Sequence, residues 1–421
     1  MQNWVEHVIW WQIYPLGFVG AETDAVDERK HRLEHVTDWL DYVLELGCNG
    51  LALGPVFASQ THGYDTIDHF SIDRRLGSET DMDALVTAAH DKGVRVLFDG
   101  VFNHVGRGHE RFVAAEKDGP DSESGRWFTW SDGRPRAFEG HDLLVELNHA
   151  NPAVQDYVVD VMNHWLARGI DGWRLDAAYA VSPDFWAAVL PRVREAHPDA
   201  WIVGEMIHGD YADYVRRSGL DSITQYELWK ATWSAIKDAN FFELAHALGR
   251  HDELLPTFVP ATFVGNHDVT RIASTLDDDR DVDIATALLF FVAGTPSVYY
   301  GDEQGFRGVK EERVGGDDAI RPQFPATPDD LAPYGWPHYR VHQSLISMRR
   351  RFPWLHHAPV EVSTLTNTTM TLSATDGSTT LALTLNLGES PIRRAKGDVV
   401  AAADGVHGDL PPHSWAVTVR Q

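Results

Sequence analysis

The 421-residue chain contains a single cysteine, Cys48. One cysteine excludes an intrachain disulfide and a zinc site made of several cysteines, and it fits a reducing compartment. No stretch approaches the roughly 18 consecutive apolar residues of a membrane span. The first 15 residues also lack the basic region with which a signal peptide begins. If Met1 is the natural start, we therefore expect a cytoplasmic protein without a membrane partner.

Positive charge is scarce as well. The 36 lysines and arginines stand against 62 aspartates and glutamates, which gives a formal net charge of −26. Such a chain repels phosphate backbones, so nucleic acid is excluded as a partner and a neutral or cationic substrate is favoured. Tryptophan, by contrast, is abundant, with 15 residues. Indole rings beyond the needs of a core often serve as flat platforms for sugars.

Short apolar runs alternate with amphipathic segments along most of the chain. We expect strands at 8–13, 48–53, 94–99, 170–175, 201–204, 222–225, 261–264 and 297–300. We expect helices at 28–46, 81–92, 152–168, 184–197, 211–218, 226–248, 284–291 and 339–351. Eight strand–helix units over about 350 residues predict an α/β fold, a parallel (β/α)₈ TIM barrel. An open doubly wound sheet is the alternative, but the glycine-rich phosphate loop typical of that fold is missing.

Two stretches interrupt this alternation and suggest a division into domains. We assign residues 1–102 and 152–353 to the barrel and residues 103–151 to a short inserted subdomain after the third strand. Residues 354–421 alternate with period two between turn signals, which predicts a small antiparallel, β-sandwich-like domain. The acidic run 277–283 reads as a solvated loop that supplies an N-cap to the next helix.

Polar motifs follow five of the predicted strands, where the catalytic groups of a barrel lie. They read HGYD after the second strand, DGVFNH at the third, RLD at the fourth, GE at the fifth and GNHD at the seventh. One carboxylate at a strand end is often just a helix cap. Three acids, two histidines and an arginine at one face instead favour a catalytic site.

These motifs resemble the signature regions of the α-amylase family of glycoside hydrolases. DGVFNH, GWRLDAA, IVGE and FVGNHD occur in the family's order, together with HGYDTIDHFSID and GTPSVYYGDEQG. LVELNHANPAVQDY and IVGE are similar to the neopullulanase and cyclomaltodextrinase branch. That branch commonly carries an N-terminal β domain, which is missing here because the first strand begins near residue 8, so the dimer formed through it cannot be assumed.

The resemblance implies a role for each matching residue. Asp176 would be the nucleophile, Glu205 the general acid and base, and Asp268 a third acid that favours the cationic transition state. Arg174 lies two residues before Asp176, so both side chains point to one side of a strand, and its guanidinium would keep that carboxylate ionised. The remaining expected site residues hold the reacting sugar or support the acids: Tyr64 by stacking, His104 and His267 by hydrogen bonds, and Asp99 by orienting Arg174 or the nucleophile.

Several residues have two readings. Asp99 is as well explained by a structural role as by direct catalysis. Trp127 and Trp130 would stack on substrate or fill the core of the insert. Arg271 and Asp302 would line outer sugar subsites or form an ordinary surface pair.

Departures from the family argue against a metal. The stretch 20–30 is short and lacks the Asp- and Gly-rich Ca²⁺ loop of many relatives, and no histidine follows Asp176 where another Ca²⁺ site would need one. A hard cation requires about six to eight oxygen ligands. We therefore predict no metal and no cofactor. Thr61 stands where exo-acting glucosidases often have an aspartate, which disfavours a one-glucose pocket.

The sequence thus predicts a retaining glycoside hydrolase. It would cleave α-1,4-glucosidic bonds of maltooligosaccharides or related α-glucans through a covalent glycosyl–Asp176 intermediate. One alternative is a transglycosidase, which passes the same intermediate to a sugar acceptor. A more distant alternative is an inactive sugar-binding protein on the same fold.

Overall fold

The computed structural model describes residues 4–313 and 315–420. Residues 1–3 and 421, at the outer limits of the expected barrel and C-terminal domains, lie outside this range. Within it, eight parallel strands form one sheet in the order β12-β11-β10-β5-β2-β1-β14-β13. Their bounds are β1 Trp10–Ile13, β2 Gly50–Leu53, β5 Arg95–Gly100, β10 Gly172–Leu175, β11 Trp201–Gly204, β12 Ser222–Ile223, β13 Ala261–Phe263 and β14 Thr295–Tyr299.

The sheet closes on itself between its two end strands, β12 and β13. A single parallel bridge joins Thr224 to Ala261 there, whereas every other neighbouring pair shares a longer ladder. The closed sheet confirms the predicted TIM barrel. Because parallel strands all point the same way, their carboxyl ends gather at one face of the barrel.

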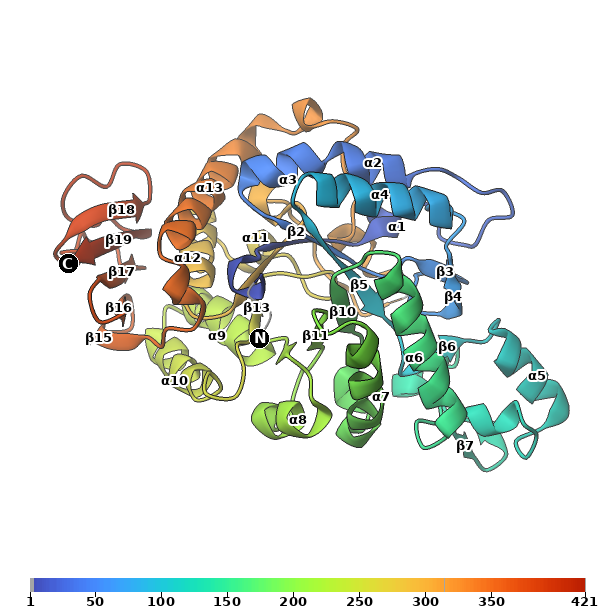
Figure 1. Cartoon of the computed structure of the whole chain (residues 1–421). Coiled ribbons are helices and arrows are strands. Elements are labelled where there is room, and N and C mark those ends of the chain that lie inside the picture. Colours follow the sequence, from blue (N-terminus) through green and yellow to red (C-terminus); the bar gives the residue numbers. More distant parts are fainter. Residues whose placement is uncertain (1–3, 314, 421) are drawn as a thin grey trace.

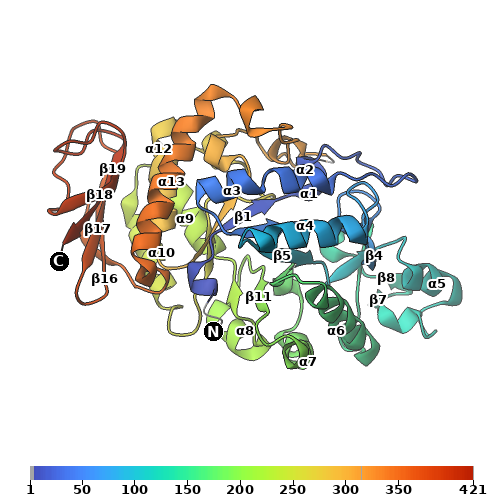
Figure 2. The same cartoon turned by 45° about the horizontal axis from the view of Figure 1, so that its top comes forward.

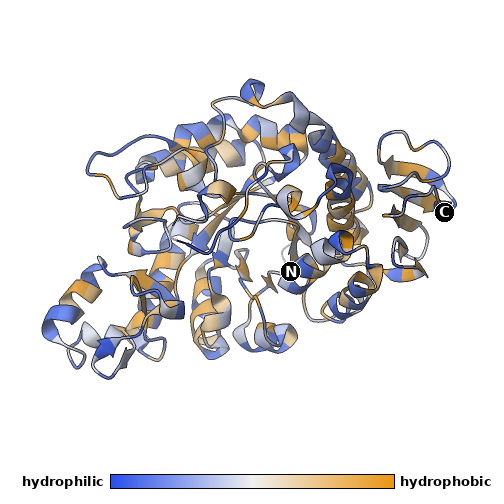
Figure 3. Ribbon diagram, turned by 180° about the vertical axis from the view of Figure 1, so that it is seen from behind, coloured by the Kyte–Doolittle hydropathy of each residue, from blue (hydrophilic) through white to orange (hydrophobic). Residues whose placement is uncertain are grey.

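Helices surround the barrel and cover the outward side of its strands (Figure 1). The helices of the barrel region are α1 Pro15–Phe18, α2 Leu33–Asp38, α3 Leu40–Leu46, α4 Glu79–Asp91, α6 Pro152–Ala167, α7 Pro183–Ala196, α8 Tyr211–Ser218, α9 Tyr226–Lys237, α10 Phe241–Asp252, α11 Ile272–Thr275, α12 Asp279–Phe291 and α13 Trp336–Arg351. Polar and apolar residues share these helices (Figure 3), as expected of helices that pack one side against a sheet.

Two helices expected as single segments are divided. The expected helix 28–46 begins later and is split at Trp39 into α2 and α3. The expected helix 226–248 is split into α9 and α10, because Ala239 adopts a left-handed φ of 47° that an α-helix does not accommodate. Hydrophobic periodicity alone does not reveal such breaks, since the apolar stripe continues across both.

The acidic run 277–283 is an N-cap only in part. The Asp278 side chain caps α12 by accepting the amide N–H of Arg280, as expected. The expected loop, however, is already helical from Asp279. Asp281 is buried, and its carboxylate lies 2.8 Å from Nδ1 of His413, the residue before β19 of the C-terminal sheet. The run therefore also anchors the C-terminal sheet to the barrel.

Two smaller units complete the chain. The insert after β5 holds helix α5 Glu110–Asp118 and the strands β6 His104–Gly106, β7 Trp130–Ser131, β8 Arg134–Pro135 and β9 Leu144–Glu146. A hairpin of β3 Phe57–Ser59 and β4 Thr66–Ile72 follows β2. The C-terminal antiparallel sheet consists of β15 Glu361–Leu365, β16 Thr369–Thr375, β17 Thr380–Asn386, β18 Asp398–Ala402 and β19 Ser414–Arg420.

The C-terminal sheet stands beside α12 and α13 on one flank of the barrel, and the insert lies on the opposite flank (Figures 1 and 2). The expected domain boundaries between these units stay predictions. No helix among the described residues is long and apolar enough to cross a membrane.

Candidate active site

Asp176 and Glu205 follow directly on two neighbouring strands. Strand β10 ends at Leu175 and β11 ends at Gly204, and these two residues are partners in the parallel ladder. The backbone N–H of Glu205 donates to the carbonyl oxygen of Leu175 at 2.9 Å, which continues the ladder to the acid itself. Both side chains are buried. The register of two strands thus places the two carboxyl groups side by side.

Arg174 connects the acids of three strands. Its guanidinium lies 2.6 Å from Asp99 at the end of β5, 2.7 Å from Glu205 and 3.3 Å from Asp176. It is buried together with all three carboxyl groups. A buried charge has to be paired, and this one cation is shared among three acids.

This sharing changes the expected state of Asp176. We expected Arg174 to keep that carboxylate ionised, but Asp99 and Glu205 are its closer partners. Burial and the neighbouring Glu205 raise the pKa of Asp176 well above its usual value, and Arg174 offsets this only in part. Burial likewise raises the pKa of Asp99 above its usual value. A site with a proton available beside a carboxylate is suited to acid–base chemistry.

Asp268 lies on the opposite side of the cluster, after β13, and it has its own cation. Its carboxylate accepts a hydrogen bond from the Nη2 of Arg321 at 2.9 Å and lies 2.8 Å from Nε2 of His267. Burial alone would raise the pKa of Asp268, but His267 and Arg321 hold this pKa below its usual value. The side chain is 31% exposed, so the cluster opens to solvent here.

Tyr64 and His267 form a flat aromatic surface beside these acids. Their rings are nearly parallel, with an interplanar angle of 7° and centroids 5.6 Å apart. The Tyr64 hydroxyl contacts the Nε2 of His267 and donates to Asp99 at 3.2 Å, while the Nδ1 of His267 lies 3.2 Å from the side-chain amide of Gln12 on β1. Each ring is therefore fixed by polar contacts at its edge, which leaves Tyr64 able to stack on a sugar.

His104 has a hydrogen-bonding nitrogen to spare. Its Nδ1 lies 3.1 Å from the amide of Asn103, and its buried Nε2 makes no hydrogen bond of normal geometry, although the ring also interacts with the Tyr64 backbone. Burial lowers the pKa of His104 to about 3, so the ring is neutral at physiological pH. Phe138 of the insert stacks on it with centroids 4.8 Å apart. An unpaired ring nitrogen in a buried polar site fits a sugar hydroxyl as the missing partner.

The side chain of Glu205 is held at both oxygens. The Tyr226 hydroxyl donates to Oε1 at 3.2 Å, and the backbone N–H of Ala177 donates to Oε2 at 3.0 Å. Ala177 takes a left-handed φ of 46°, uncommon for a residue other than glycine, and this turns its N–H toward the acid. Asn266 in turn donates to Tyr226 at 2.9 Å. The acid is thereby oriented by residues from three segments.

The structure brings together all of the expected site residues, namely Tyr64, Asp99, His104, Arg174, Asp176, Glu205, His267 and Asp268. Asp99 pairs with Arg174 and Tyr64, which favours the supporting role over direct catalysis.

Four residues with two readings are also decided by their surroundings. Trp127 is buried against Tyr157 of α6, and Trp130 donates its indole N–H to the Gly125 carbonyl within the insert, so both rings serve packing. Arg271 and Asp302 form a buried pair at 2.8 Å. Neither interpretation fits the structure, because both side chains are buried rather than exposed to solvent or to a sugar.

Sequence reasoning missed several residues that touch this cluster. Arg321 comes from the long segment after β14, and its Nε also donates to the His267 carbonyl at 2.9 Å. Its guanidinium lies over the ring of Tyr14, 4.6 Å from the centroid. No motif marked it, because its partner Asp268 is 53 residues away in the chain. Tyr226 and Gln12 were missed for the same reason, whereas Asn266 stands in the GNHD motif but was given no role there.

No group of three or more His, Cys, Asp or Glu side chains in the described part of the chain is arranged to hold a metal ion. The absence of a metal or cofactor stays a prediction.

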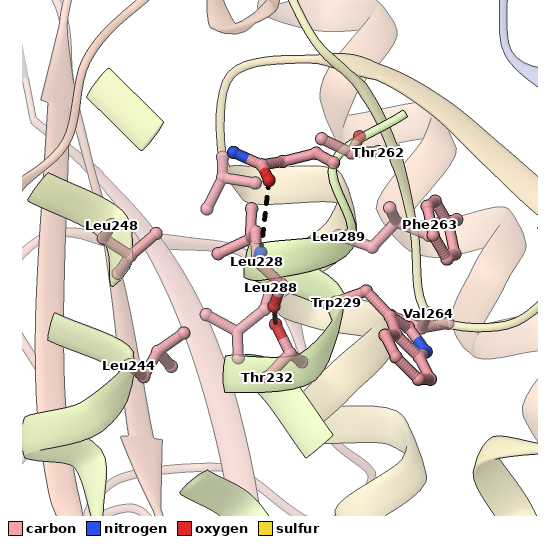
Figure 4. Close-up of a pocket in the computed structure, with 12 residues that line it drawn as sticks. Leu228, Trp229, Thr232, Leu244, Leu248, Thr262, Phe263, Val264, Leu288 and Leu289 are labelled. Carbon is pink, nitrogen blue, oxygen red and sulfur yellow. Dashed lines mark hydrogen bonds between the residues drawn. The ribbon is translucent and has the colours of Figure 1, made fainter. Parts of the chain in front are cut away.

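A cavity elsewhere in the fold is unsuited to a substrate. It lies between β13 and helices α9, α10 and α12, and Leu228, Leu244 and Leu288 are among the side chains that line it (Figure 4). Its volume is about 10 Å³. That is room for a single water molecule at most, so this space is a packing gap and not a second binding site.

Comparisons with known proteins agree with the resemblance seen in the sequence motifs. The family model described as "Alpha amylase, catalytic domain" matches residues 12–330. A cyclomaltodextrinase of Bacillus sp is 33% identical over 339 residues, which cover 72% of this chain and 60% of that protein. An intracellular maltogenic amylase of Bacillus subtilis (strain 168) is 30% identical over 337 residues, covering 73% of this chain and 57% of the relative. The chain thus spans less than two thirds of the length of these relatives.

A solved structure matches the chain end to end. The ligand-free cyclic α-maltosyl-(1→6)-maltose hydrolase of Arthrobacter globiformis superposes with a TM-score of 0.84 at 26% identity. The match covers 100% of this chain and 99% of that one. The cyclomaltodextrinase match confirms the branch that the sequence motifs indicated.

Proposed function

Because this chain belongs to the α-amylase family of glycoside hydrolases, we propose that it is a retaining glycosidase that cleaves α-1,4-glucosidic bonds of maltooligosaccharides or related α-glucans. One observation carries the proposal. The guanidinium of Arg174 lies within 3.3 Å of Asp176 and 2.7 Å of Glu205, so one cation holds both carboxyl groups at neighbouring strand ends. A retaining mechanism needs such a pair on the two sides of one glycosidic bond.

Asp176 has to react in its ionised form, although burial raises its pKa in the free enzyme. In the first half of the reaction, its carboxylate attacks the anomeric carbon of the bound sugar. Glu205 gives its proton to the glycosidic oxygen, so the leaving sugar departs as a neutral alcohol and an ester to Asp176 remains. Asp268, held ionised by Arg321 and His267, stabilises the positive charge that develops on the sugar ring. Tyr64 and His104 hold the same ring, by stacking and by a hydrogen bond.

In the second half, a water molecule gives its proton to Glu205 while its oxygen attacks the anomeric carbon. The bond to Asp176 breaks, and the carboxylate is restored. If a sugar hydroxyl replaces the water, the product is a new glycoside. Transfer to sugars therefore remains the alternative outcome for the same intermediate, and new, longer products at high substrate concentration would reveal it.

The initial product anomer tests the mechanism. We expect maltotetraose to yield the α-anomer first, observed by proton NMR before mutarotation. Incubation with 5-fluoro-α-glucosyl fluoride should add the mass of one fluorosugar to the peptide that contains Asp176. A β-anomer as the first product would exclude a glycosyl–enzyme intermediate and overturn the proposal.

Cyclic oligosaccharides are a second candidate substrate class. The solved hydrolase named for cyclic α-maltosyl-(1→6)-maltose matches this chain over nearly the full length of both, and one relative is named cyclomaltodextrinase. The discriminating measurement is kcat/KM on maltotetraose, β-cyclodextrin and cyclic α-maltosyl-(1→6)-maltose. A preference above about tenfold for a cyclic compound would assign the enzyme to that class.

We also infer a cytoplasmic location. It is supported by the single cysteine and by the relative that is named intracellular maltogenic amylase. Fractionation of the native host with an antibody against this chain would test it.

A further inference from the structure

The insert reaches across to the barrel at Glu139. This residue lies in the short 3₁₀ turn Phe138–Gly140, and its Oε1 accepts a hydrogen bond from the Tyr179 hydroxyl at 2.9 Å. Tyr179 follows the proposed nucleophile Asp176 by three residues. One hydrogen bond therefore joins the insert to the loop after β10, across the catalytic face.

The backbone of the insert is turned to make this contact. Glu139 has φ 50° and ψ 27°, in the left-handed region that residues other than glycine avoid. Its neighbour Phe138 stacks on His104, the residue that we expect to hold the reacting sugar. Two consecutive residues of the insert thus contact two different parts of the proposed site.

Tyr179 lies on the Glu205 side of the cluster. Its backbone N–H donates to the carbonyl oxygen of Glu205 at 3.2 Å. Burial raises the pKa of its phenol, and the negative charges of Glu139, Glu205 and Asp176 raise it further. The Tyr64 hydroxyl, in contrast, contacts Asp99 and His267, and His267 lies 2.8 Å from Asp268. The two tyrosines therefore flank the pair of catalytic carboxyl groups from different sides.

This placement distinguishes the two sugars on either side of the bond to be cleaved. The general acid protonates the oxygen between the reacting sugar and the leaving sugar. A ring beside Glu205 and away from Tyr64 therefore faces the leaving sugar. His208, from the loop after β11, lies on the same side, with its ring centroid 5.3 Å from that of Tyr179.

We propose that the hydrogen bond between Tyr179 and Glu139 fixes one side of the binding site for the leaving sugar, and so determines how tightly the enzyme holds it. The inference rests on the proposed function and adds a specificity role for two residues that no motif marked. Burial and the adjacent Glu139 carboxylate raise the pKa of the Tyr179 phenol, which therefore remains a donor at physiological pH. Without this bond the Tyr179 ring and the Phe138–Gly140 turn are no longer held together.

A substrate without a leaving sugar isolates this effect. α-Maltosyl fluoride releases fluoride, which needs neither a sugar subsite nor a proton from the general acid. Maltotetraose needs both. Tyr179→Phe and Glu139→Ala should lower kcat/KM for maltotetraose about tenfold, mainly through KM, because each removes a hydrogen bond to a charged group. Turnover of α-maltosyl fluoride should stay within about twofold of the wild type, and this also shows that the variants fold.

Two controls accompany these variants. Glu139→Gln keeps a side-chain oxygen that can accept the hydrogen bond from the Tyr179 hydroxyl, so it should retain most of the wild-type activity on maltotetraose. Glu123→Ala removes another exposed glutamate of the insert and should change neither reaction.

Three outcomes would decide against the inference. Equal losses on both substrates would mean a general structural role, and no loss on either would mean that the contact is irrelevant to the leaving sugar. In both cases the proposed function would stand, since the wild type turns over both compounds. If the wild type turned over neither compound, the proposed function would be wrong and the inference would fall with it.

Discussion

The two ends of the barrel carry very different side chains on the same eight strands. At the carboxyl end, Asp99, Arg174, Asp176 and Glu205 are buried in mutual contact. At the amino end, the interior is filled by apolar residues from five strands and from the segment before β1. These residues are Val5, Val8, Trp10, Leu97, Trp201 and Val203, together with Trp4, Ala52 and Ala261 at the edge.

Packing at the amino end is close enough to restrict the choice of residues. Trp10 of β1 and Trp201 of β11 stack inside the barrel, with centroids 5.7 Å apart and an interplanar angle of 13°. Gly50 leaves room for them, because a Cβ at that position would lie 2.4 Å from the Trp10 ring. Dense apolar packing of this kind stabilises a fold, whereas buried charges seldom do. The comparison therefore suggests that stability and chemistry are separated along the barrel axis.

Asp176→Asn should give the largest effect on activity and no loss of stability. We expect kcat on maltotetraose to fall at least about 10⁴-fold, since the proposed nucleophile is removed. The folded-state pKa of Asp176 is raised by burial and by Glu205. Its contribution to stability is thus complete below the unfolded value near 3.8 and is lost as the pH rises through the folded value.

Asparagine does not ionise, so thermal unfolding of Asp176→Asn should depend less on pH above about 4 than that of the wild type. Asp184→Asn, at an exposed position of α7, is the matched control and should change neither property. A variant that stays active on every α-glucan cleaved by the wild type, or that unfolds at lower temperature at pH 7, would contradict the assignment.

Trp10→Ala tests the opposite end. It should destabilise the fold by about 3–5 kcal/mol in urea unfolding, because it leaves a large cavity beside Trp201. At temperatures where the variant is folded, kcat/KM should stay within about twofold of the wild type. Trp10→Phe keeps an aromatic ring against Trp201 and should recover part of the loss. A selective loss of activity in the folded variant would show that the two ends are coupled.

Much of the fold could be predicted because periodicity and strand ends are local properties of a sequence. All eight barrel strands and most helices lie where hydrophobic alternation indicated. In the C-terminal domain the alternation indicates strands at 360–366, 369–374, 379–387 and 415–419, so strand β18 was not expected. Its residues Asp398 and Val399 are exposed, and a register shift between Val399 and Ala401 disturbs its alternation. Edge strands that face solvent and contain a bulge give no clear two-residue period.

The sequence predicted a site residue only where that residue directly follows or ends a strand. Arg174 and Asp176 share a strand face, so their contact followed from spacing. That Arg174 lies closer to Asp99 and Glu205 depends on the registers of three strands. Arg321 and Glu139 come from long connecting segments, whose path no periodicity gives.

Arg321→Ala separates charge support from the chemistry itself. We expect kcat/KM to fall about 10- to 100-fold, since Asp268 loses its guanidinium partner. Burial alone would raise the pKa of Asp268, and Arg321 is one of the groups that hold it low. Its removal should therefore shift the acid limb of the pH–activity profile to higher pH. Arg321→Lys should return the acid limb of the pH–activity profile most of the way to its wild-type pH. An acid limb at the wild-type pH in Arg321→Ala would refute the proposed support of Asp268 by Arg321.

His90→Gln should have the smallest effect, and only on stability. At the amino end, Asp171 is paired with His90 at 2.8 Å and Arg95 at 2.6 Å, and it accepts the Val96 N–H at 2.8 Å. Against the effect of burial, these contacts hold the pKa of Asp171 below its usual value. The stabilisation is thus present above the unfolded value near 3.8 and is lost as the pH falls through the folded one.

His90 is 36% exposed, and glutamine still offers an N–H, so the loss should be below about 1 kcal/mol in urea unfolding at pH 7. Hydrolysis of maltotetraose should not change. The ion pairs of Asp171 at the amino end would then support the fold alone, whereas the ion pairs of Arg174 at the carboxyl end support catalysis. A drop in kcat/KM beyond about twofold would mean that this end influences the catalytic face, and the separation along the barrel axis would have to be abandoned.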